Sequence, residues 1–394
     1  MNIVFFDDEK RDKFLPLAYT KPIAKFRVGI LTIEEKWEHY FRKEKLDYSI
    51  SYSTEEYLLD KYKSDEQAEN WFINSRYFPT QELVGYIVNT LKSNQGLFIG
   101  DDFVAAKLAE ADYKTGKYEQ LDWEGEDPIH LELVTDIFSK NGLAIEQDFE
   151  FLTKGRESAQ VSSTNTIIGD NIFLEEGASV EASVLNSTSG PIYIAKNAEV
   201  MEGSLVRGPF AMCESSVIKM GAKIYGPTTL GRFSKVGGEV NNCVIQDYSN
   251  KGHDGFLGNS IIGEWCNLGA DTNTSNLKNN YGQVKLWSYE TEMFSETGLQ
   301  FCGLIMGDHS KCGINTMFNT GTVVGVSANV FDSGFPAKYI PSFSWGGASG
   351  FVACKLDKMF EVADIVMGRR GIELDDKEKA ILTAIFEMTT NFRQ

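Results

Sequence analysis

The sequence predicts two kinds of structure in one chain: an α/β domain with a mainly parallel sheet, followed by a left-handed parallel β-helix. Short apolar runs alternate with helical patterns at the start of the chain, and a six-residue apolar period begins at about residue 160. Two further helical patterns close the chain. We therefore expect three domains, at 1–155, 156–345 and 346–394.

The N-terminal pattern gives strands and helices in alternation, which is typical of an α/β fold. The expected strands are Ile3–Phe6, Trp71–Ile73 and Gly96–Ile99, and the expected helices are Ile33–Lys43, Leu83–Leu91, Phe103–Glu110 and Ile129–Asn141.

The six-residue period is the strongest signal. Counting in steps of six, eight successive positions are apolar: Ile194, Val200, Val206, Met212, Ile218, Ile224, Leu230 and Val236. A three-sided coil needs one short strand and one corner per six residues, and the apolar residue fills the axis while each coil covers the edge of the next. Glycines that follow the apolar residue, such as Gly269 and Gly313, are expected at corners with unusual φ.

Interruptions of the period predict excursions from the coils. The frame shifts by two residues between Val180 and Ile194 and again between Val236 and Ile262, which predicts loops at corners. The break at 277–303 predicts a larger insertion. After the coils, Gly350–Met367 and Asp375–Met388 are expected to be helices, the second with an acidic start.

Composition limits the partners. A net charge of −18 argues against nucleic acid, and it suits a small anionic ligand only where Lys and Arg cluster locally. The six cysteines include no CxxC pair, and no zinc spacing is present. The first residues lack a signal-peptide pattern, and no apolar run is long enough to cross a membrane. We expect a cytoplasmic protein without a membrane partner.

A motif carries the first functional indication. The segment 250–277 contains His253, then Phe256-Leu257-Gly258, then Asn267-Leu268-Gly269-Ala270, then Asn276-Leu277. This spacing resembles the acetyltransferase domain of the bifunctional N-acetylglucosamine-1-phosphate uridyltransferase/glucosamine-1-phosphate acetyltransferase family. It is also similar to archaeal sugar-1-phosphate nucleotidyltransferases with the same tail.

The resemblance implies roles for individual residues. His253 would be the general base that takes a proton from a sugar amine, a task that suits an imidazole near neutral pH. The positions implied to contact the sugar substrate are Lys219, Phe256, Asn267, Asn276 and Lys285, and those implied to contact acetyl-CoA are Ala270, Leu277 and Gly313.

The chain departs from the family at two places. Asn241 stands where the family has a second phosphate-binding Lys, and Phe256 stands where it has a Tyr. Arg232 or Lys235 could replace the lost cation, or the acceptor is not a simple sugar 1-phosphate.

The first domain resembles a divergent bacterial group of nucleotidyltransferase-like, Rossmann-like domains fused to the same β-helix. Nucleotidyltransferases of this architecture open with a Gly-rich loop, which this sequence lacks; residues 14–29 instead resemble the start of the divergent group. The resemblance implies nucleotide-binding roles for Lys21, Lys25, Arg27 and Arg76, and it implies that Asp101, after the strand Leu97–Ile99, holds Mg²⁺. An active nucleotidyltransferase and a degenerate domain both remain open.

Three functions follow. The first is a transferase of sugar-phosphate or sugar-nucleotide metabolism that N-acetylates an amino-sugar phosphate with acetyl-CoA and His253, with or without nucleotidyl transfer (UTP or dTTP plus a sugar 1-phosphate) by the first domain. The second is a nucleotidyltransferase whose β-helix only assembles the protein. The third is a non-catalytic sugar-nucleotide-binding protein. The resemblance implies a homotrimer.

Overall fold

A computed structural model describes residues 1–65 and 67–393, and the chain divides into two compact units. The first unit comprises Met1–Phe14, Thr20–Phe26 and Leu31–Glu132, and the second comprises Leu15–Tyr19, Arg27–Ile30 and Leu133–Gln394. Two short segments of the N-terminal sequence thus belong to the second unit. The three-domain division stays a prediction.

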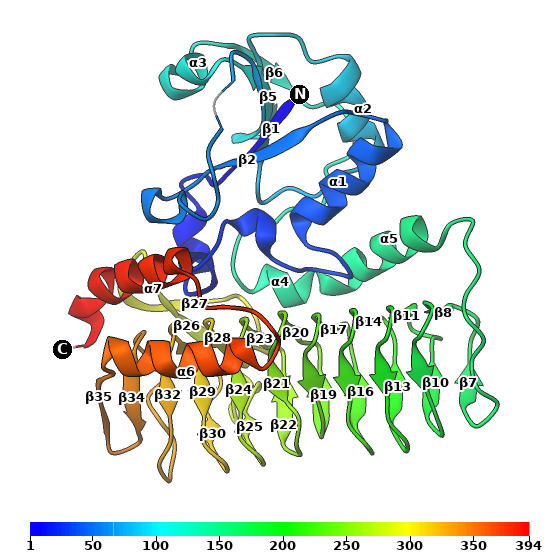
Figure 1. Cartoon of the computed structure of the whole chain (residues 1–394), viewed down its shortest axis with the longest axis vertical. Helices are drawn as coiled ribbons and strands as arrows, with labels where there is room; N and C mark the ends of the chain where they lie inside the picture. The colour runs from blue at the N-terminus through cyan, green and yellow to red at the C-terminus, as the bar shows by residue number, and fades with distance from the viewer. Residues whose placement is uncertain (66, 394) are drawn as a thin grey trace. The chain divides into compact units, whose positions relative to one another are not determined.

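The first unit is built on a mixed six-stranded sheet of order β2-β1-β3-β5-β4-β6 (Figure 1). β1 pairs in parallel with β2 and β3, whereas β5 is antiparallel to β3 and β4. The strands are β1 (Asn2–Phe6), β2 (Ser49–Ser53), β3 (Asn70–Asn74), β4 (Gln95–Ile99), β5 (Asp102–Leu108) and β6 (Glu119–Asp122), and the helices are α1 (Ile33–Lys43), α2 (Gln81–Asn89) and α3 (Glu110–Thr115).

Local signals fix the first helix. Thr32 accepts a hydrogen bond from the backbone N–H of Glu35, and the Glu35 side chain accepts one from the backbone N–H of Thr32. This reciprocal capping box satisfies two amides that the first turn would leave unpaired. The expected helix Ile33–Lys43 is therefore found with the same ends.

Two expected helices of this region are wrong. Residues 103–108 form strand β5, because they pair with β3 on one side and β4 on the other and bring Ala106 and Leu108 into the core with Phe72. Such pairing overrides the helical preference of Ala, Lys and Leu. Of the expected helix 129–141, only α4 (Asp136–Ser139) forms. Before it, His130 forms an isolated bridge with Tyr77, the backbone N–H of Leu131 donates to the carbonyl oxygen of Arg76, and residues 132–135 form bends and turns.

The second unit is a β-helix with three parallel walls (Figure 1). The first wall contains β7 (Thr166–Ile168), β10 (Val184–Asn186), β13 (Leu205–Arg207), β16 (Lys223–Tyr225), β19 (Glu239–Asn241) and β22 (Phe256–Gly258). The second contains β8 (Ile172–Leu174), β11 (Ile192–Ile194), β14 (Phe210–Met212), β17 (Thr228–Leu230), β20 (Val244–Ile245), β23 (Ile261–Ile262), β28 (Leu304–Met306), β31 (Thr322–Val324) and β33 (Tyr339–Ile340).

The third wall carries the candidate site. It contains β9 (Ser179–Val180), β12 (Glu199–Val200), β15 (Val217–Ile218), β18 (Lys235–Val236), β21 (Asn250–Lys251), β24 (Asn267–Leu268), β29 (Lys311–Cys312), β32 (Asn329–Val330), β34 (Ser344–Gly347) and β35 (Gly350–Ala353). A short additional pair joins β25 (Asn273–Thr274) to β30 (Met317–Phe318).

The repeat has the structural meaning that the sequence predicted. The eight residues from Ile194 to Val236 all lie in one buried core along the axis, and the left-handed β-helix is confirmed.

The role expected for the repeat's glycines is wrong at Gly269 and Gly313, neither of which has a positive φ. A Cβ added at Gly269 would overlap the backbone of Gly313, so a small residue is needed for close stacking of coils. Gly169 does have a positive φ, and other corners with positive φ are occupied by larger residues, among them Phe233, Tyr248 and Trp265.

The second frame shift marks short coils rather than an added loop. Partners on the third wall are 18 residues apart from Val217 to Lys235, 15 apart from Lys235 to Asn250, and 17 apart from Asn250 to Asn267. Losing residues from two corners changes the phase of the repeat as effectively as adding them does. The expected loop at this point is therefore wrong, and the segment with His253 lies in the shortened region.

The insertion after β25 is an ordered hairpin of β26 (Lys285–Ser288) and β27 (Met293–Glu296). Its Trp287 ring stacks on Tyr339 of β33 with centroids 4.2 Å apart. An aromatic contact of this kind adds to the area buried and holds the hairpin against the second wall.

Within the described residues, the α-helices of the second unit are α4, α5 (Asn141–Thr153), α6 (Leu356–Gly368) and α7 (Asp376–Met388). The expected helix at 350–367 begins later, since 350–353 pair with β34 as an antiparallel hairpin. Asp375 caps α7 by accepting from the backbone N–H of Glu378, as the acidic start indicated. Among the residues that the structure describes, no helix is long and apolar enough to cross a membrane.

Candidate active site

A groove of about 670 Å³ lies on the third wall and brings together four of the predicted site residues. Its lining includes His253, Lys219, Asn267 and Ala270. The wall side comes from β15, β18, β21, β24 and β29, and the opposite side comes from Val366, Arg369 and Arg370 at the end of α6. The β-helix brings residues 219, 253 and 267 together because each coil returns the chain to the same wall.

His253 lies at the corner between β21 and β22, and its side chain is exposed to the groove. Within the described residues, no hydrogen bond to its imidazole is formed. Its backbone is held instead, because the Nζ atom of Lys251 donates to its carbonyl oxygen at 2.7 Å. An exposed imidazole on an anchored backbone is available to exchange a proton with a bound ligand.

Lys251 occupies an inward position of the β-helix. It pairs in register with Val236, which belongs to the axial core, and only 2% of its surface is exposed. The ammonium also donates to the carbonyl oxygen of Gly237 at 2.8 Å. Burial lowers the pKa of Lys251 to about 8, because removing the charged form from water is costly.

Phe256 and Asn276 form a second cluster on the first wall and do not line the groove. Both contact the Cα side of Gly258, and the Asn276 Nδ2 atom donates to the Asn259 Oδ1 atom at 2.8 Å. The backbone N–H of Phe256 donates to the Asn273 Oδ1 atom. The motif at 250–277 thus turns a corner, and it distributes its residues over two walls.

Three further predicted residues do not line the groove. Lys285 is on the insertion hairpin, 3.6 Å from Glu296. Leu277 bridges to Phe301, and Gly313 lies behind Gly269 in the next coil.

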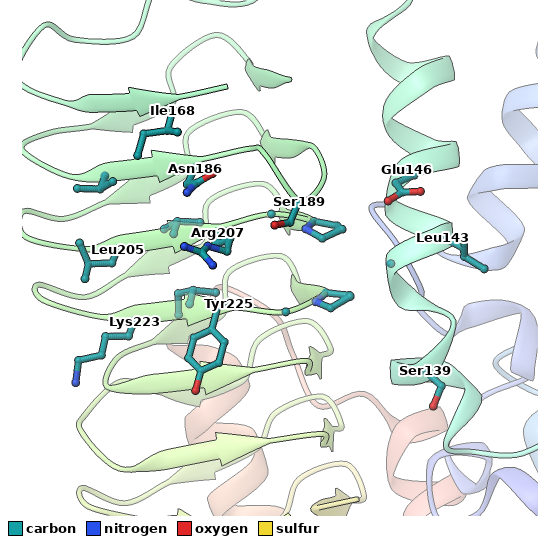
Figure 2. A pocket seen from close by; sticks show the side chains of 18 residues that line it. Ser139, Leu143, Glu146, Ile168, Asn186, Ser189, Leu205, Arg207, Lys223 and Tyr225 are labelled. Carbon is teal, nitrogen blue, oxygen red and sulfur yellow. The ribbon is translucent and has the colours of Figure 1, made fainter. Parts of the chain in front are cut away.

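A larger cavity of about 1000 Å³ lies elsewhere on the second unit, between the first wall and α5 (Figure 2). Leu143, Leu205 and Ile168 are exposed there, and Arg207 and Lys223 lie on the strands opposite Glu146. None of the predicted site residues lines it. Its size therefore does not make it the site that the motif predicts.

Aromatic rings form one end of the groove that contains His253. Tyr248 and Trp265 line it, and their rings stack with centroids 4.1 Å apart. Phe233 continues the stack at 5.4 Å from Tyr248. This aromatic stack could not be predicted from the sequence, because the three residues are 15 and 17 positions apart and become neighbours only when the coils stack.

In the first unit, Arg76, which was predicted to bind a nucleotide, is buried. Its guanidinium donates to Asp8, Asp102 and Glu132 at 2.7–2.9 Å and to the carbonyl oxygen of Leu131. These contacts engage all five N–H groups, which differs from the expected role in nucleotide binding. Lys10 joins the same cluster through Asp102 and Glu132 and was missed from the sequence.

The surroundings of Asp101 bear on the prediction that this residue holds Mg²⁺. Asp101 is exposed in the turn between β4 and β5, and its neighbour Asp102 enters the cluster instead. Both Asp102 oxygens accept hydrogen bonds, from Lys10, Arg76 and Tyr77, which hold the pKa of this carboxyl well below its usual range although burial opposes them. Three donors occupy most of the lone pairs of the Asp102 carboxylate and offset its charge, so Asp102 is a poor ligand for Mg²⁺.

The remaining basic candidates are separated. Lys25 pairs with Glu34 at 2.7 Å, and Lys21 is buried in the first unit. Arg27 belongs to the second unit, where its guanidinium donates to the carboxylate of Asp247 and to the carbonyl oxygen of Ile30. The expectation that Arg27 binds a nucleotide is therefore replaced by a structural role on the β-helix.

The hexapeptide repeat and the His253 groove define a class: β-helix proteins of the hexapeptide type, here preceded by a Rossmann-like domain. Comparison with known proteins identifies the relatives. Residues 3–157 match the family described as sugar nucleotidyl transferase. The resemblance that the motifs predicted, to bifunctional sugar-1-phosphate nucleotidyltransferase/acetyltransferases, is confirmed.

Individual relatives are distant. The chain is 28% identical over 162 residues to the bifunctional sugar-1-phosphate nucleotidylyltransferase/acetyltransferase of Sulfurisphaera tokodaii, covering 41% of this chain and 39% of that one. It is 38% identical over 87 residues to the bifunctional protein GlmU of Methanocaldococcus jannaschii, covering 22% and 21%. A match to GlmU of Methanococcus maripaludis is 29% identical and covers 68% of this chain and 57% of the relative. The chain thus spans well under two thirds of their lengths.

Proposed function

We propose that the protein transfers an acetyl group from acetyl-CoA to the amine of an amino-sugar phosphate, with His253 as general base. The single observation that carries the proposal is the exposure of this imidazole in a groove that also contains Asn267 and Lys219. A purely structural β-helix has no need for an exposed His, an exposed amide and cations around one cavity.

The chemistry needs one proton transfer at a defined atom. The thioester supplies the acyl group. As the acceptor nitrogen bonds to the thioester carbonyl carbon, the unprotonated ring nitrogen of His253 takes a proton from that nitrogen. The carbon–sulfur bond then breaks, and the sulfur leaves as the thiol after receiving a proton. Amide and thiol are the products.

The surrounding residues position the reactants. The Asn267 side chain is exposed in the groove and offers an amide donor and acceptor, and Ala270 leaves space beside it. Lys219 provides a cation for the acceptor phosphate. Lys251 holds the backbone of His253 from inside the coil, so the imidazole starts from a fixed Cα.

A second function is favoured by the family match over residues 3–157. Under this proposal the first unit binds a sugar nucleotide or transfers a nucleotidyl group at the ends of β1 and β3, beside the ion-pair cluster of Asp8, Arg76 and Lys10 and without a contact from Arg76. The carboxyl end of a parallel sheet is where α/β domains bind ligands. Asp102 already accepts hydrogen bonds from Lys10, Arg76 and Tyr77, which favours binding over a metal-dependent transfer.

We propose from the resemblance that the protein acts as a homotrimer in the cytoplasm.

The test is release of thiol from acetyl-CoA in the presence of a panel of amino-sugar phosphates. We expect His253→Ala to lower the rate at least 100-fold, and His39→Ala, on helix α1, to leave it unchanged. Full activity in the His253 variant would remove the proposed base. Pyrophosphate formation from a nucleoside triphosphate and a sugar phosphate, with no thiol release for any acceptor, would favour the second function.

A further inference from the structure

The first wall presents apolar side chains on its outer surface in the coils that face α5. Val184 and Leu205 are in register on β10 and β13, and both point outward because the residues that follow them, Leu185 and Val206, belong to the axial core. Half of the Leu205 surface and 41% of that of Ile168 are exposed. All three outward residues line the cavity between this wall and α5. A contiguous apolar surface of this kind marks a contact with a ligand or a partner.

The cavity is preformed, because the start of α5 is fixed to the β-helix. The Asn141 Nδ2 atom donates to the carbonyl oxygen of Pro227 at 3.3 Å, and the Thr229 Oγ1 atom donates to the Asn141 Oδ1 atom at 3.0 Å. A Cβ added at Gly142 would lie only 2.9 Å from the Cγ atom of Pro227. The volume of about 1000 Å³ is at the upper end of the range of small-molecule sites, and a preformed cavity binds its ligand without first ordering the chain.

Two cations lie on the same wall, Arg207 on β13 and Lys223 on β16. Lys223 is in register with Leu205, so Arg207 stands two residues further along the neighbouring strand, roughly 8 Å away between Cα atoms. Both side chains are exposed, and within the described residues neither forms an ion pair or a side-chain hydrogen bond. Two long cationic side chains at this separation can reach one anion between them.

Two carboxylates are also nearby, and neither occupies the Arg207 guanidinium. Glu239 is in register with Lys223 and accepts a hydrogen bond from the Tyr225 hydroxyl. Figure 2 shows Arg207 between its neighbours on successive strands, with Glu146 of α5 facing the wall across the cavity. The free guanidinium therefore offers its planar set of N–H donors beside an apolar surface, an arrangement that matches a carboxylate or a phosphate.

These two features narrow the class of ligand when they are taken together. An inorganic anion would satisfy Arg207 but leave the outer side chains of β7, β10 and β13 in water. An uncharged apolar ligand would cover those side chains but remove water from the guanidinium without replacing its hydrogen bonds. Glu146 would repel a second negative charge on the opposite side of the cavity. A ligand with a single anionic end and an apolar body meets all of these conditions.

We infer that the cavity between the first wall and α5 binds an amphiphilic anion. Arg207 and Lys223 hold its carboxylate or phosphate head, and its apolar chain or ring covers the outer side chains of β7, β10 and β13. This site lies on a different wall from the His253 groove and shares no lining residue with it, so the inference goes beyond the proposed acetyl transfer and does not depend on it.

The experiment is a fluorescence titration of the full chain with 8-anilinonaphthalene-1-sulfonate, an anion with an apolar ring system. The bound dye is then displaced with decanoate, decyl phosphate, decanol or acetate. We expect decanoate or decyl phosphate to compete about tenfold or more better than decanol, which lacks the charge, and better than acetate, which lacks the chain. The better of the two anionic competitors identifies the head group as a carboxylate or a phosphate.

Three exposed residues provide the variants. Arg207→Gln should weaken binding of the anionic competitors about tenfold, because it removes the charge and most of the donors. Leu205→Asn should weaken binding about threefold or more, because it removes apolar contact area. Lys196→Gln, at an exposed lysine of the same β-helix outside the cavity, is the matched control and should change binding less than twofold. Circular dichroism checks that all three variants are folded.

Several outcomes would overturn the inference: no displaceable dye on the wild type, equal affinities of wild type and Arg207→Gln, or decanol competing as well as decanoate. Sedimentation velocity tests the other possible occupant, a second copy of the chain. Absence of displaceable dye together with an oligomer that Leu205→Asn dissociates would show that the apolar wall is a contact between copies and would also reject the ligand site.

Discussion

The Nζ atom of Lys251 lies 2.7 Å from the backbone carbonyl oxygen of His253, and it reaches that oxygen from the axis of the β-helix. An aliphatic residue is the rule at this inward position, as Val236 and Leu268 in the neighbouring coils show. The chain therefore buries the amine of Lys251 where an aliphatic side chain would make the folded protein more stable. The buried Nζ atom lies next to the backbone of the proposed base. Such an exchange of stability for position is typical of functional sites.

Lys251→Met should separate the effect of Lys251 on stability from its effect on the position of His253. We expect the free energy of unfolding at pH 7 to rise by roughly 2 kcal/mol, because an apolar side chain of similar volume replaces a buried charge. We expect thiol release to fall about tenfold, because the His253 carbonyl loses its partner. Urea unfolding and the acetyl-transfer assay measure the two quantities. A fall in both would mean that Lys251 is mainly needed for folding.

The pH dependence of stability provides an independent check. The pKa of Lys251 is about 8 in the folded protein, below the ordinary value of 10.5, so the unfolded chain binds more protons between these limits. The free energy of unfolding of the wild type should therefore rise with pH, relative to Lys251→Met, by about 3 kcal/mol from below pH 8 to above pH 10.5. Urea titrations of both proteins at pH 7, 8.5 and 9.5 test this; parallel curves would contradict it.

Asn267 and Asn276 should differ in importance although the motif contains both. Asn267 lines the groove with His253, and Asn276 lies on the first wall bonded to Asn259. We expect Asn267→Ala to lower kcat/KM at least tenfold and Asn276→Ala to lower it less than threefold in the same acetyl-transfer assay. The reverse order would place the reaction on the first wall.

Arg76→Met should destabilise the first unit by about 3–5 kcal/mol, because it leaves Asp8 and Asp102 without their buried cation. Asp102 has a depressed pKa in the folded state, so its stabilising contribution is present above pH 4 and is lost as the pH falls through the folded pKa. The variant should consequently unfold at a higher pH than wild type on acidification, followed by circular dichroism. Arg76→Lys keeps the charge without the fork and should be intermediate.

Gly269→Ala tests close stacking of the coils. A Cβ at this position would overlap the backbone of Gly313, and we expect a loss of about 1–3 kcal/mol in unfolding free energy. Gly368→Ala, on helix α6 with open space around it, is the control and should stabilise by up to about 1 kcal/mol. Equal effects of the two substitutions would show that the coils can separate without cost.

Much of the second unit could be predicted because its information is local and repeated. Each six-residue step in 194–236 carries its own apolar residue, and the structure buries all eight. The frame shift at 236–262 could be recognised in the sequence. Whether residues had been added or lost could not, because a shortened coil and an added loop produce the same change of phase.

The first unit was harder for a physical reason. Helix α1 has a capping box that four residues specify, whereas β5 depends on strands β3 and β4, about 30 and 5 residues before it. A short run such as Phe103–Leu108 is compatible with helix or strand until its neighbours are known.

The sequence by itself determined the β-helix, the presence of a Rossmann-like domain and the motif around His253. Only the tertiary structure decided which of the motif's residues share a wall, that Arg27 and Arg76 are occupied by carboxylates, and that Arg369 and Arg370 reach the groove. The reason is distance along the chain: a repeat is encoded within a few residues, but a site is assembled by coils and helices that meet only after folding.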